Sequence, residues 1–236
     1  MQAKVKLIRK EVVAQGTMAF HFAKPPGFEF RAGQFAEFAL IDPPQTDDEG
    51  NSRAFSLVHA PFEPDLVAAT RMRDTAFKRV LKDLPIGAEL RLDGPYGDFT
   101  LHKTASTPAV FIIGGIGVTP VRSMIAQASH DKTGHTITLL HASRTPADLP
   151  LQADFAQLAK DNPDFTYVMF VDEAGGDWRG ERGHVTAEMV KRYVPDLTRP
   201  IYYLSGPQGM VKAMRKLLVD LKVNEDNIRT EEFAGY

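Results

Sequence analysis

The spacing of apolar segments changes near residue 104, and this change divides the 236-residue chain into two parts. Before it, short alternating strands are separated by turn residues at 25–27, 31–33 and 85–87. Beyond it, apolar strands alternate with helical patterns about every thirty residues, the size of a βαβ unit. The first pattern is typical of a small antiparallel barrel, and the second of a parallel sheet covered by helices. We therefore expect two domains: a β-barrel over residues 1–103 and an α/β domain over residues 104–236.

Apolar residues at helical spacing predict one helix inside the barrel part, over 75–84, with Asp74 or Thr75 as its cap. In the second part, the pattern predicts strands over 109–113, 136–141, 165–171 and 201–204 and helices over 120–128, 152–160, 186–193 and 208–223. The acidic loop, residues 45–51, is expected to be solvated and mobile.

The composition excludes several classes of function. A net charge of −2 gives no broad attraction to nucleic acid, and the absence of cysteine excludes disulfides, thiolate zinc sites and cysteine-ligated iron–sulfur clusters. The seven histidines are scattered without metal-site spacing, so we expect no metal. No apolar run approaches the roughly 18 residues of a membrane span, and no signal-peptide pattern opens the chain. These features favour a soluble cytoplasmic protein.

A strand-to-helix turn near the middle of the chain is rich in glycine. Gly114, Gly115 and Gly117 follow a buried-type strand. Thr119 can cap the helix that comes next, and Pro120 fits its first position. The spacing is G-x-G-x-x-P, so the dinucleotide fingerprint is not met. By themselves, the glycines fit a ligand cradle and a closely packed turn equally well.

A second turn of the same kind favours the ligand. Ser205, Gly206 and Pro207 lead from a strand into a helix that contains Met210. In a parallel sheet both turns lie at the carboxyl ends of the strands, where open α/β sheets bind ligands. Two such turns indicate a groove for a flat or phosphorylated ligand.

The chain carries five short motifs in order: R-A-F-S at 53–56, G-P-Y-G-D-F at 94–99, G-G-I-G-V-T-P at 114–120, S-G-P-Q-G-M at 205–210 and E-E-F-A-G-Y at 231–236. Together they resemble the motifs of the ferredoxin–NADP reductase superfamily. The resemblance covers nearly the whole chain. It implies an FAD-binding barrel followed by an NAD(P)-binding domain. FAD would be tightly bound between them, and NADPH or NADH would be the co-substrate.

The resemblance implies flavin contacts in the barrel part. Arg53 would pair with the flavin pyrophosphate, as a guanidinium suits phosphate. Phe55 would lie against the isoalloxazine, pack in the barrel core, or both, and Ser56 would hydrogen-bond near N5, which receives the hydride. The helix after Thr75 would direct its free N–H groups at the pyrophosphate. The full expected set is Arg53, Ala54, Phe55, Ser56, Thr70, Arg71, Met72, Thr75, Ala76, Phe77, Phe233 and Tyr236.

In the second part, the resemblance implies contacts with the nicotinamide nucleotide. The residues expected to bound it are Gly114, Gly115, Gly117, Thr119, Pro120, Gly206, Pro207 and Met210. Ser205 stands where the family often has cysteine; its hydroxyl can still hydrogen-bond, and no covalent role is lost. Ser143 and Arg144 could hold a 2′-phosphate, which favours NADPH, or be a strand-end serine and a solvated arginine.

The expected catalytic residues are Ser56, Ser205, Glu231 and Tyr236. Glu231 would relay a proton or orient the nicotinamide, or be an exposed carboxylate. Tyr236 would stack on the flavin, a contact of roughly 0.5–1.5 kcal/mol that an arriving nicotinamide can displace. Alternatively, Phe233 packs beneath the ring, or the tail frays.

The resemblance thus implies a stand-alone FAD-dependent NAD(P)H reductase without an iron–sulfur domain. It would pass single electrons to a separate ferredoxin or flavodoxin. A basic collar would assist that encounter, with candidates at Arg71, Arg73, Lys78, Arg79 and Arg122, although Arg71 and Arg73 would point to opposite sides of one strand. Two alternatives stay open: an electron-transfer subunit of a larger complex, and a free-flavin or ferric reductase that binds flavin loosely.

Overall fold

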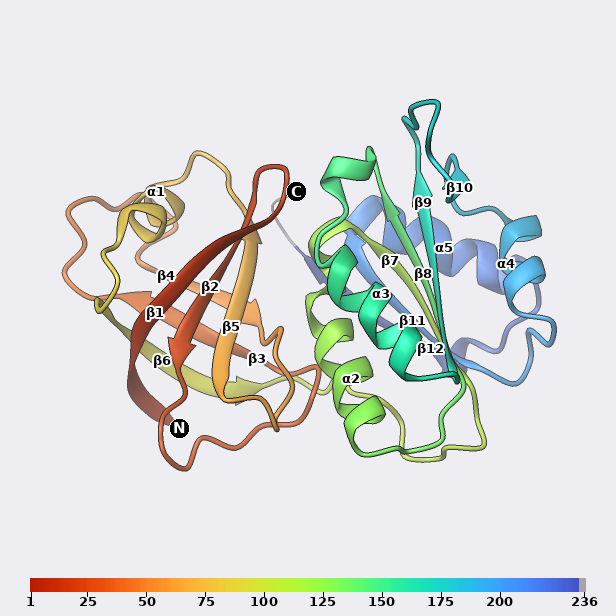
Figure 1. Cartoon of the computed structure of the whole chain (residues 1–236), viewed down its shortest axis with the longest axis horizontal. Helices are drawn as coiled ribbons and strands as arrows, with labels where there is room; N and C mark the ends of the chain where they lie inside the picture. Colours follow the sequence, from red (N-terminus) through yellow and green to blue (C-terminus); the bar gives the residue numbers. More distant parts are fainter. Residues whose placement is uncertain (234–236) are drawn as a thin grey trace.

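The computed structural model describes residues 1–233 and shows two sheets side by side (Figure 1). Strands from the first part of the chain form a six-stranded antiparallel sheet, and strands from the second part form a six-stranded parallel sheet. The predicted fold class, an antiparallel barrel followed by an α/β domain, is confirmed.

The first sheet is rolled into a barrel. A backbone bridge between Leu57, directly after β4, and Ala68 of β5 joins its two edges at one point. Alternate residues point inward and fill it with apolar side chains, among them Phe20, Phe22 and Phe38. Its strands run in the order β4-β3-β6-β1-β2-β5, and their bounds are β1 (Gln2–Ala14), β2 (Thr17–Ala23), β3 (Phe35–Leu40), β4 (Ser52–Ser56), β5 (Asp65–Arg71) and β6 (Glu89–Tyr96).

One helix, α1 (Ala76–Asp83), closes an end of the barrel. Thr75 caps it, with its side-chain oxygen accepting a hydrogen bond from the Lys78 N–H at 3.3 Å. Phe77 and Leu81 are buried on its inner face. The helix predicted at this place, and Thr75 as its cap, are therefore confirmed.

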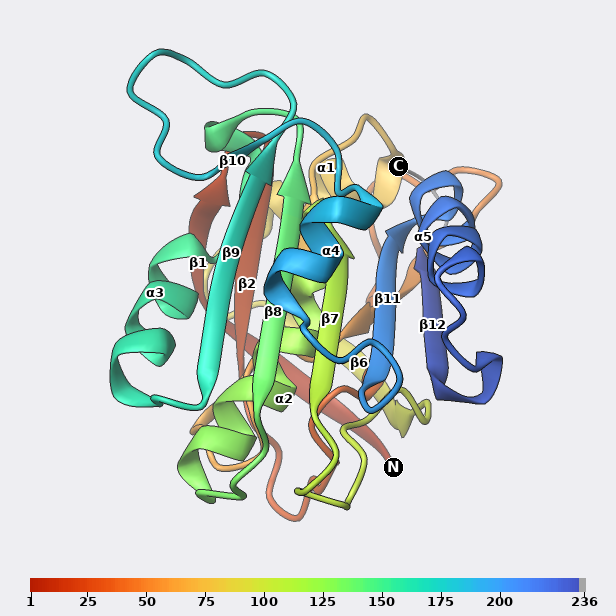
Figure 2. The same ribbon diagram turned by 90° about the vertical axis from the view of Figure 1, so that its right-hand side faces the viewer.

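The second sheet is sandwiched between helices (Figure 2). All six residues of β7 are buried, as expected for a central strand covered on both faces. The strands run in the order β10-β9-β8-β7-β11-β12, with bounds β7 (Ala109–Gly114), β8 (Ile137–Ser143), β9 (Phe165–Val171), β10 (Glu181–Arg182), β11 (Ile201–Pro207) and β12 (Ile228–Phe233). The helices are α2 (Thr119–His130), α3 (Gln152–Asp161), α4 (Ala187–Tyr193) and α5 (Gln208–Asp220).

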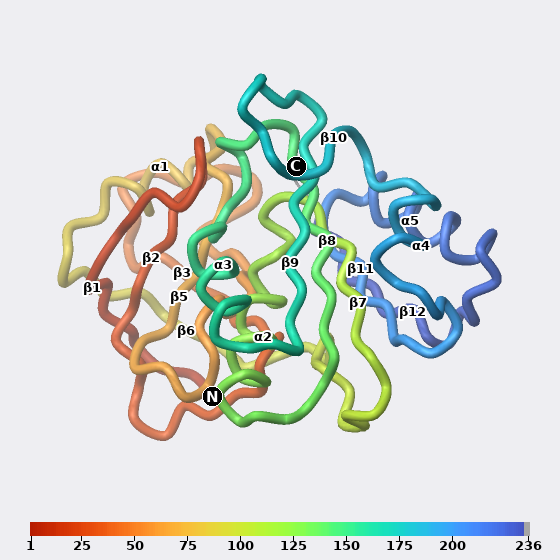
Figure 3. Tube along the Cα trace, turned by 45° about the vertical axis from the view of Figure 1, so that its right-hand side comes forward, coloured from red at the N-terminus to blue at the C-terminus, as the bar shows by residue number. Residues whose placement is uncertain are grey.

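The α2–α3 layer stands between the barrel and the parallel sheet (Figure 3). One apolar cluster crosses this boundary and includes Val58 and Ala69 of the barrel, Val121 and Met124 of α2, and Phe155 of α3. The two sheets therefore share buried apolar surface, which fixes their relative position. Within residues 1–233, no helix is both long and apolar enough to cross a membrane.

Some predicted details differ from the structure. Thr119 is not the cap of α2: Val118 is, because a 3₁₀ turn over Gly115–Val118 moves the helix start, and the Thr119 hydroxyl donates to the Ile116 carbonyl at 3.1 Å. The acidic loop is not merely solvated, because the Asp47 carboxylate accepts a hydrogen bond from the Ala76 N–H at the start of α1.

The strands β10 and β12 were not predicted as strands. Strand β12 pairs in parallel with β11 at the sheet edge, and only Ile228 of its six residues is buried. An edge strand with so little apolar burial gives a weak periodic signal. Its formation brings Glu231 into register with Ser205.

Candidate functional site

A cavity of about 450 Å³ opens between the barrel and the parallel sheet; we call it the barrel-side cavity. Strands β4 and β5 and the start of α1 form one wall, and Ile116, Thr119 and Phe233 form the other. The residues expected at a flavin that line it are Arg53, Ala54, Phe55, Ser56, Thr70, Arg71, Thr75 and Phe233. The structure thus gathers most of that expected set around one space.

Three residues of the expected flavin set do not line this cavity. Phe77 is buried in the barrel core, Met72 packs against that core, and Ala76 contributes only its backbone N–H, which donates to Asp47. Arg71 and Arg73 both line the cavity, whereas two such residues of one strand would point to opposite sides. Strand β5 ends at Arg71, and side-chain alternation does not continue past it.

Arg53 is held by carboxylates at the mouth of the barrel-side cavity. Its guanidinium donates to Glu49 Oε2 at 2.7 Å, lies 3.5 Å from Asp47 Oδ1 and stacks over the Phe77 ring at 5.2 Å. The hydrogen bond from the Ala76 N–H is the main cause that lowers the pKa of Asp47. Two acidic side chains therefore occupy donors that an anion such as a phosphate would use.

A second cavity of about 230 Å³ lies at the carboxyl ends of the parallel strands; we call it the glycine-turn cavity. It shares Arg71 and Ile116 with the barrel-side cavity, so the two spaces are contiguous. Its lining includes Gly114, Gly115, Ser143, Arg144, Pro207 and Met210 from the expected nucleotide set. Gly117, Pro120 and Gly206 do not line it, and Thr119 faces the barrel-side cavity instead.

The close contact between the two turns explains why several of their residues are glycine. A Cβ on Gly117 would lie 2.7 Å from the Gly206 backbone, and a Cβ on Gly206 would lie 2.9 Å from the Gly114 carbonyl. Gly206 also has a φ of +142°, which side-chain-bearing residues rarely adopt. These glycines let the turns touch each other, whereas Gly115 lines the glycine-turn cavity.

A buried histidine, His141, hydrogen-bonds to the backbone of the glycine turn that follows β7. Burial lowers the pKa of His141 to about 4, so its ring is neutral at pH 7. Its Nε2–H donates to the Gly115 carbonyl at 3.0 Å, and its Nδ1 lies 3.3 Å from the Tyr167 hydroxyl. This hydrogen bond supports Gly115 in its left-handed conformation, φ +50°.

Two expected catalytic side chains meet across the edge of the sheet. Ser205 on β11 is in register with Glu231 on β12, so their side chains point to the same face. Ser205 Oγ and Glu231 Oε2 are buried, and neither has a hydrogen-bond partner within residues 1–233. Burial, with a contribution from the charge of Asp98, raises the pKa of Glu231 to about 7. Buried polar atoms without partners are rare, and they mark places where a ligand can bind.

The residues expected to select between NADPH and NADH have partners already. Arg144 Nε donates to Glu173 Oε1 at 2.8 Å, and the Ser143 hydroxyl donates to the Asp148 carbonyl at 3.3 Å. Asp148 and Asp172 also line the glycine-turn cavity. These acidic residues were missed in the sequence, although Asp172 directly follows β9 at the ligand-binding edge.

Two further expectations concern the edge of the site. Tyr236, expected to stack on a flavin, lies outside the described residues, while Phe233 lines the barrel-side cavity. Arg122 is not part of an exposed basic collar: its side chain is 11% exposed and pairs with Glu63 and Asp154.

Known proteins are similar to this chain in sequence and in fold. Residues 111–216 match the oxidoreductase NAD-binding domain family. The chain is 30% identical over 242 residues to the reductase component of propane 2-monooxygenase from Rhodococcus jostii, an alignment that covers 98% of this chain and 64% of that protein. It is 27% identical to the glycine betaine monooxygenase reductase subunit of Chromohalobacter salexigens, over 93% of this chain and 60% of that protein. It thus spans less than two thirds of these relatives.

Solved structures show the same architecture over the whole chain. The FAD/NAD-binding domain of nitric oxide dioxygenase from Vibrio cholerae superposes with a TM-score of 0.84 at 18% identity, covering 98% of both chains. A ferredoxin NADP⁺ reductase from Neisseria gonorrhoeae gives a TM-score of 0.81 at 20% identity, again covering 98% of both chains. The family match shows an oxidoreductase NAD-binding domain over residues 111–216, and the solved structures show that the whole chain shares its two-domain fold with FAD/NAD-binding proteins, including a ferredoxin NADP⁺ reductase.

Proposed function

We propose that this chain is an FAD-dependent NAD(P)H reductase that delivers electrons to a separate carrier protein. In this proposal residues 1–103 bind FAD and residues 104–236 bind the nicotinamide nucleotide. The observation that carries it is the contact between the barrel-side and glycine-turn cavities, which share Arg71 and Ile116. Hydride transfer requires the reacting atoms to be about 3–3.5 Å apart, so two ligands that react must meet at a common wall.

The donors around the barrel-side cavity suit FAD. Arg53, Arg71 and Arg73 offer guanidinium groups to a pyrophosphate, and the first turn of α1 offers N–H groups. Phe55 and Phe233 supply apolar surface for a ring. When bound, a flavin supplies the capacity to accept a hydride and to release electrons one at a time.

Polar side chains of the chain would orient the reacting rings. Ser56 lines the barrel-side cavity, and its hydroxyl would hydrogen-bond the edge of a bound ring. Ser205 and Glu231, which lack partners in the described part of the chain, would hydrogen-bond the nicotinamide carboxamide. With its pKa near 7, Glu231 holds a proton on part of the molecules at neutral pH and so can donate as well as accept.

The glycine-turn cavity favours NADH as the electron donor. Ser143 and Arg144 drew attention to NADPH in the sequence, but Arg144 is paired with Glu173, and Asp148 and Asp172 line the cavity. Carboxylates accept hydrogen bonds from a free ribose 2′-hydroxyl and repel a 2′-phosphate. Stopped-flow bleaching of the flavin by NADH and by NADPH measures this preference directly, and faster bleaching by NADPH would contradict it.

The test of flavin binding is the variant Arg53→Ala. We expect wild-type protein to stay yellow after desalting, and the variant to bind FAD about 10- to 100-fold more weakly, since hydrogen bonds to charged groups contribute about 1.5–3 kcal/mol. Arg91→Ala, an exposed arginine on β6, is the control. Colourless wild-type protein that FAD does not reconstitute would refute the proposal, and weak FAD binding would favour a free-flavin or ferric reductase.

The carrier protein is proposed to be a ferredoxin or flavodoxin. Arg71, Arg73 and Lys78 line the barrel-side cavity and would attract an acidic carrier. The names of the relatives favour a variant of this idea, an electron-transfer subunit of a larger oxygenase system. Reduction of a purified ferredoxin that slows with added salt would support a free carrier. Reduction only in the presence of an oxygenase component would support the subunit.

A further inference from the structure

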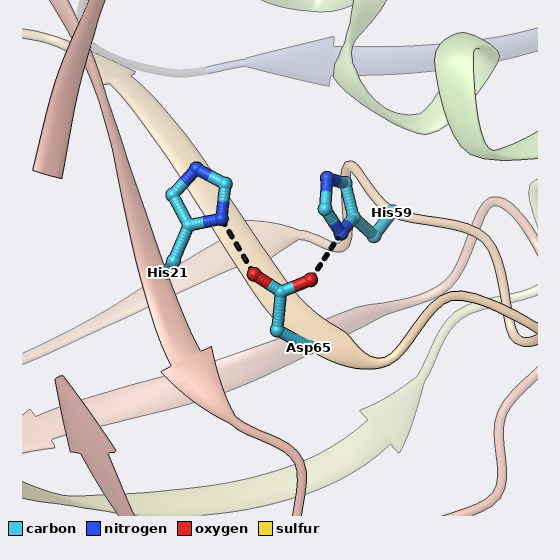
Figure 4. A group of neighbouring side chains, drawn as sticks. All are labelled: His21, His59 and Asp65. Carbon is cyan, nitrogen blue, oxygen red and sulfur yellow. Dashed lines mark hydrogen bonds and ion pairs between the residues drawn. The ribbon is translucent and has the colours of Figure 1, made fainter. Parts of the chain in front are cut away.

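Three side chains far apart in the sequence meet on the side of the barrel that faces α2 (Figure 4). His21 comes from β2, Asp65 from the start of β5, and His59 from the loop between β4 and β5. Their ligand atoms all lie within 4.8 Å of one another. None of the three lines the barrel-side or the glycine-turn cavity, so the proposed reductase function does not use them.

In this His21–His59–Asp65 cluster, both histidine rings contact the Asp65 carboxylate, and each ring lies against a different oxygen (Figure 4). His21 Nδ1 lies 2.6 Å from Asp65 Oδ2, and His59 Nδ1 lies 2.7 Å from Asp65 Oδ1. The second contact is short but lacks hydrogen-bond geometry, so His59 Nδ1 is buried without a hydrogen-bond partner in the described part of the chain. A metal ion would give this nitrogen a partner.

The donor set is one that zinc uses. Two imidazoles and a carboxylate, with water in a fourth position, form an open tetrahedral zinc site. With bonds of about 2.0 Å, the ligand atoms of such a site lie about 3.3 Å apart. The two histidine nitrogens contact different oxygens of Asp65, at 2.6 and 2.7 Å, so a carboxylate that binds zinc through one oxygen must turn, and the contact to that oxygen must open by about 0.6–0.7 Å. Two of the three residues are anchored in strands, and only the side chains need to adjust.

The surroundings of the cluster supply what a metal site needs beyond its ligands. The other ring nitrogen of His21, Nε2, lies 2.9 Å from Glu11 Oε1, a carboxylate–histidine pair that would fix the ring when Nδ1 binds a metal. Arg9 Nη2 lies 2.9 Å from Nε2 and 3.2 Å from Nδ1, so metal binding at Nδ1 requires the Arg9 guanidinium to move aside. The backbone carbonyl of His59 accepts a hydrogen bond from the Ser123 hydroxyl of α2 at 2.9 Å. Both histidines are therefore held in place by groups outside the ligand set.

The local charge also suits a divalent cation. Around the two rings, the described residues place two more carboxylates than guanidinium groups: Glu11, Glu63, Asp65 and Asp154 against Arg9 and Arg122. A cavity of about 490 Å³, lined by Glu11, His59 and Asp154, reaches the cluster at His59, whereas His21 and Asp65 do not line it.

We propose that His21, His59 and Asp65 bind one zinc ion, with a water molecule from the adjacent cavity as the fourth ligand. The ion joins β2, β5 and the loop between β4 and β5. Through the Ser123 hydrogen bond it also stiffens the contact of that loop with α2. No metal was expected from the sequence, because the ligands have no local spacing: His21 and Asp65 are 44 residues apart.

The experiment is a calorimetric titration of tag-free, chelator-treated, full-length protein with ZnCl₂. We expect one zinc ion per chain in the wild type and a higher Tm when it is bound. His59→Ala should weaken zinc binding by at least about 100-fold, and Glu11→Ala by about 10- to 100-fold, since losing a group that orients a ligand has that effect. Because the chain has no cysteine, no thiolate competes for the ion.

The control is His184→Ala. His184 Nδ1 lies 2.8 Å from Asp172 Oδ1, an exposed histidine–carboxylate pair with no second histidine, so its loss should not change zinc binding. Absence of zinc binding in the wild type would overturn the proposal, as would binding that survives His59→Ala. If that variant does not fold, the visible spectrum of the Co²⁺-loaded wild type decides: a tetrahedral spectrum supports the site, and a purely octahedral one rejects it.

Discussion

Glu231 is a carboxyl group whose ionisation the fold opposes. It lies beside Ser205 at the edge of the parallel sheet, and burial raises its pKa to about 7. Its folded pKa therefore lies above the ordinary value of 4.5, so its contribution to stability is fully present below pH 4.5 and is lost as the pH rises through 7. The same property makes it suited to hold a proton near a bound ring.

For Glu231→Gln, we expect the free energy of unfolding to exceed that of the wild type at pH 8 and to match it more closely at pH 5. The difference between the two pH values should reach up to about 3 kcal/mol, because one pKa unit corresponds to about 1.4 kcal/mol. Urea unfolding at both pH values measures it. The exposed neighbour variant Glu232→Gln is the control, and an equal pH effect in both variants would contradict the assignment.

Gly206→Ala tests whether the two turns need bare backbone to touch. We expect a loss of at least about 1–3 kcal/mol of stability, because alanine at a φ of +142° is strained and its Cβ would meet the Gly114 carbonyl. Gly209→Ala is the matched control: it lies in the first turn of α5 with open space around it, and alanine favours helix there. Thermal unfolding compares the two, and equal Tm values would reject the packing argument.

At the scale of elements, the acidic loop, residues 45–51, is hydrogen-bonded to the start of α1. Asp47 accepts the Ala76 N–H and Arg53 is held by Glu49, so the loop places negative charge where the proposed FAD would place its pyrophosphate. The loop and the cofactor would then compete for the same donors.

We therefore expect Asp47→Ala to bind FAD about two- to fivefold more tightly than the wild type. Fluorescence titration of flavin-free protein with FAD measures the affinity. Asp48→Ala, an exposed acidic residue of the same loop, removes the same charge and serves as the control. Equal tightening in both variants would mean that net charge, and not the Asp47 contact, controls binding.

Local signals account for what the sequence predicted well. Helix α1 was predicted to within a residue or two of its observed ends because a capping threonine and regular apolar spacing act over one or two turns. The same approach missed β12, which exists through its pairing with β11, and it placed Arg122 on the surface. Pairing partners and burial of a charged side chain depend on the packing of distant segments, which short patterns do not contain.

Across the whole molecule, Arg122 ties three segments together. Its guanidinium, 11% exposed, pairs with Glu63 in the loop between β4 and β5 and with Asp154 on α3. Ser123 on the same helix donates to the His59 carbonyl of that loop. The polar contacts complement the apolar cluster that already joins the barrel to α2 and α3.

Arg122→Ala should lower the free energy of unfolding by about 3–5 kcal/mol, because it leaves the largely buried Glu63 carboxylate without its charged partner. Arg215→Ala, which breaks an exposed pair with Glu225, should cost less than about 1 kcal/mol and serves as the control. Denaturant unfolding of both variants compares them. Similar losses would show that the Arg122 pairs do not join the two domains energetically.

Strand β12 has a practical consequence for anyone who engineers this chain. It carries Phe233 to the wall of the barrel-side cavity, so a group attached beside Phe233 would obstruct that cavity. The N-terminus lies away from it, at the opposite end of the barrel (Figure 1). Affinity tags, fluorophores and immobilisation anchors therefore belong at the N-terminus.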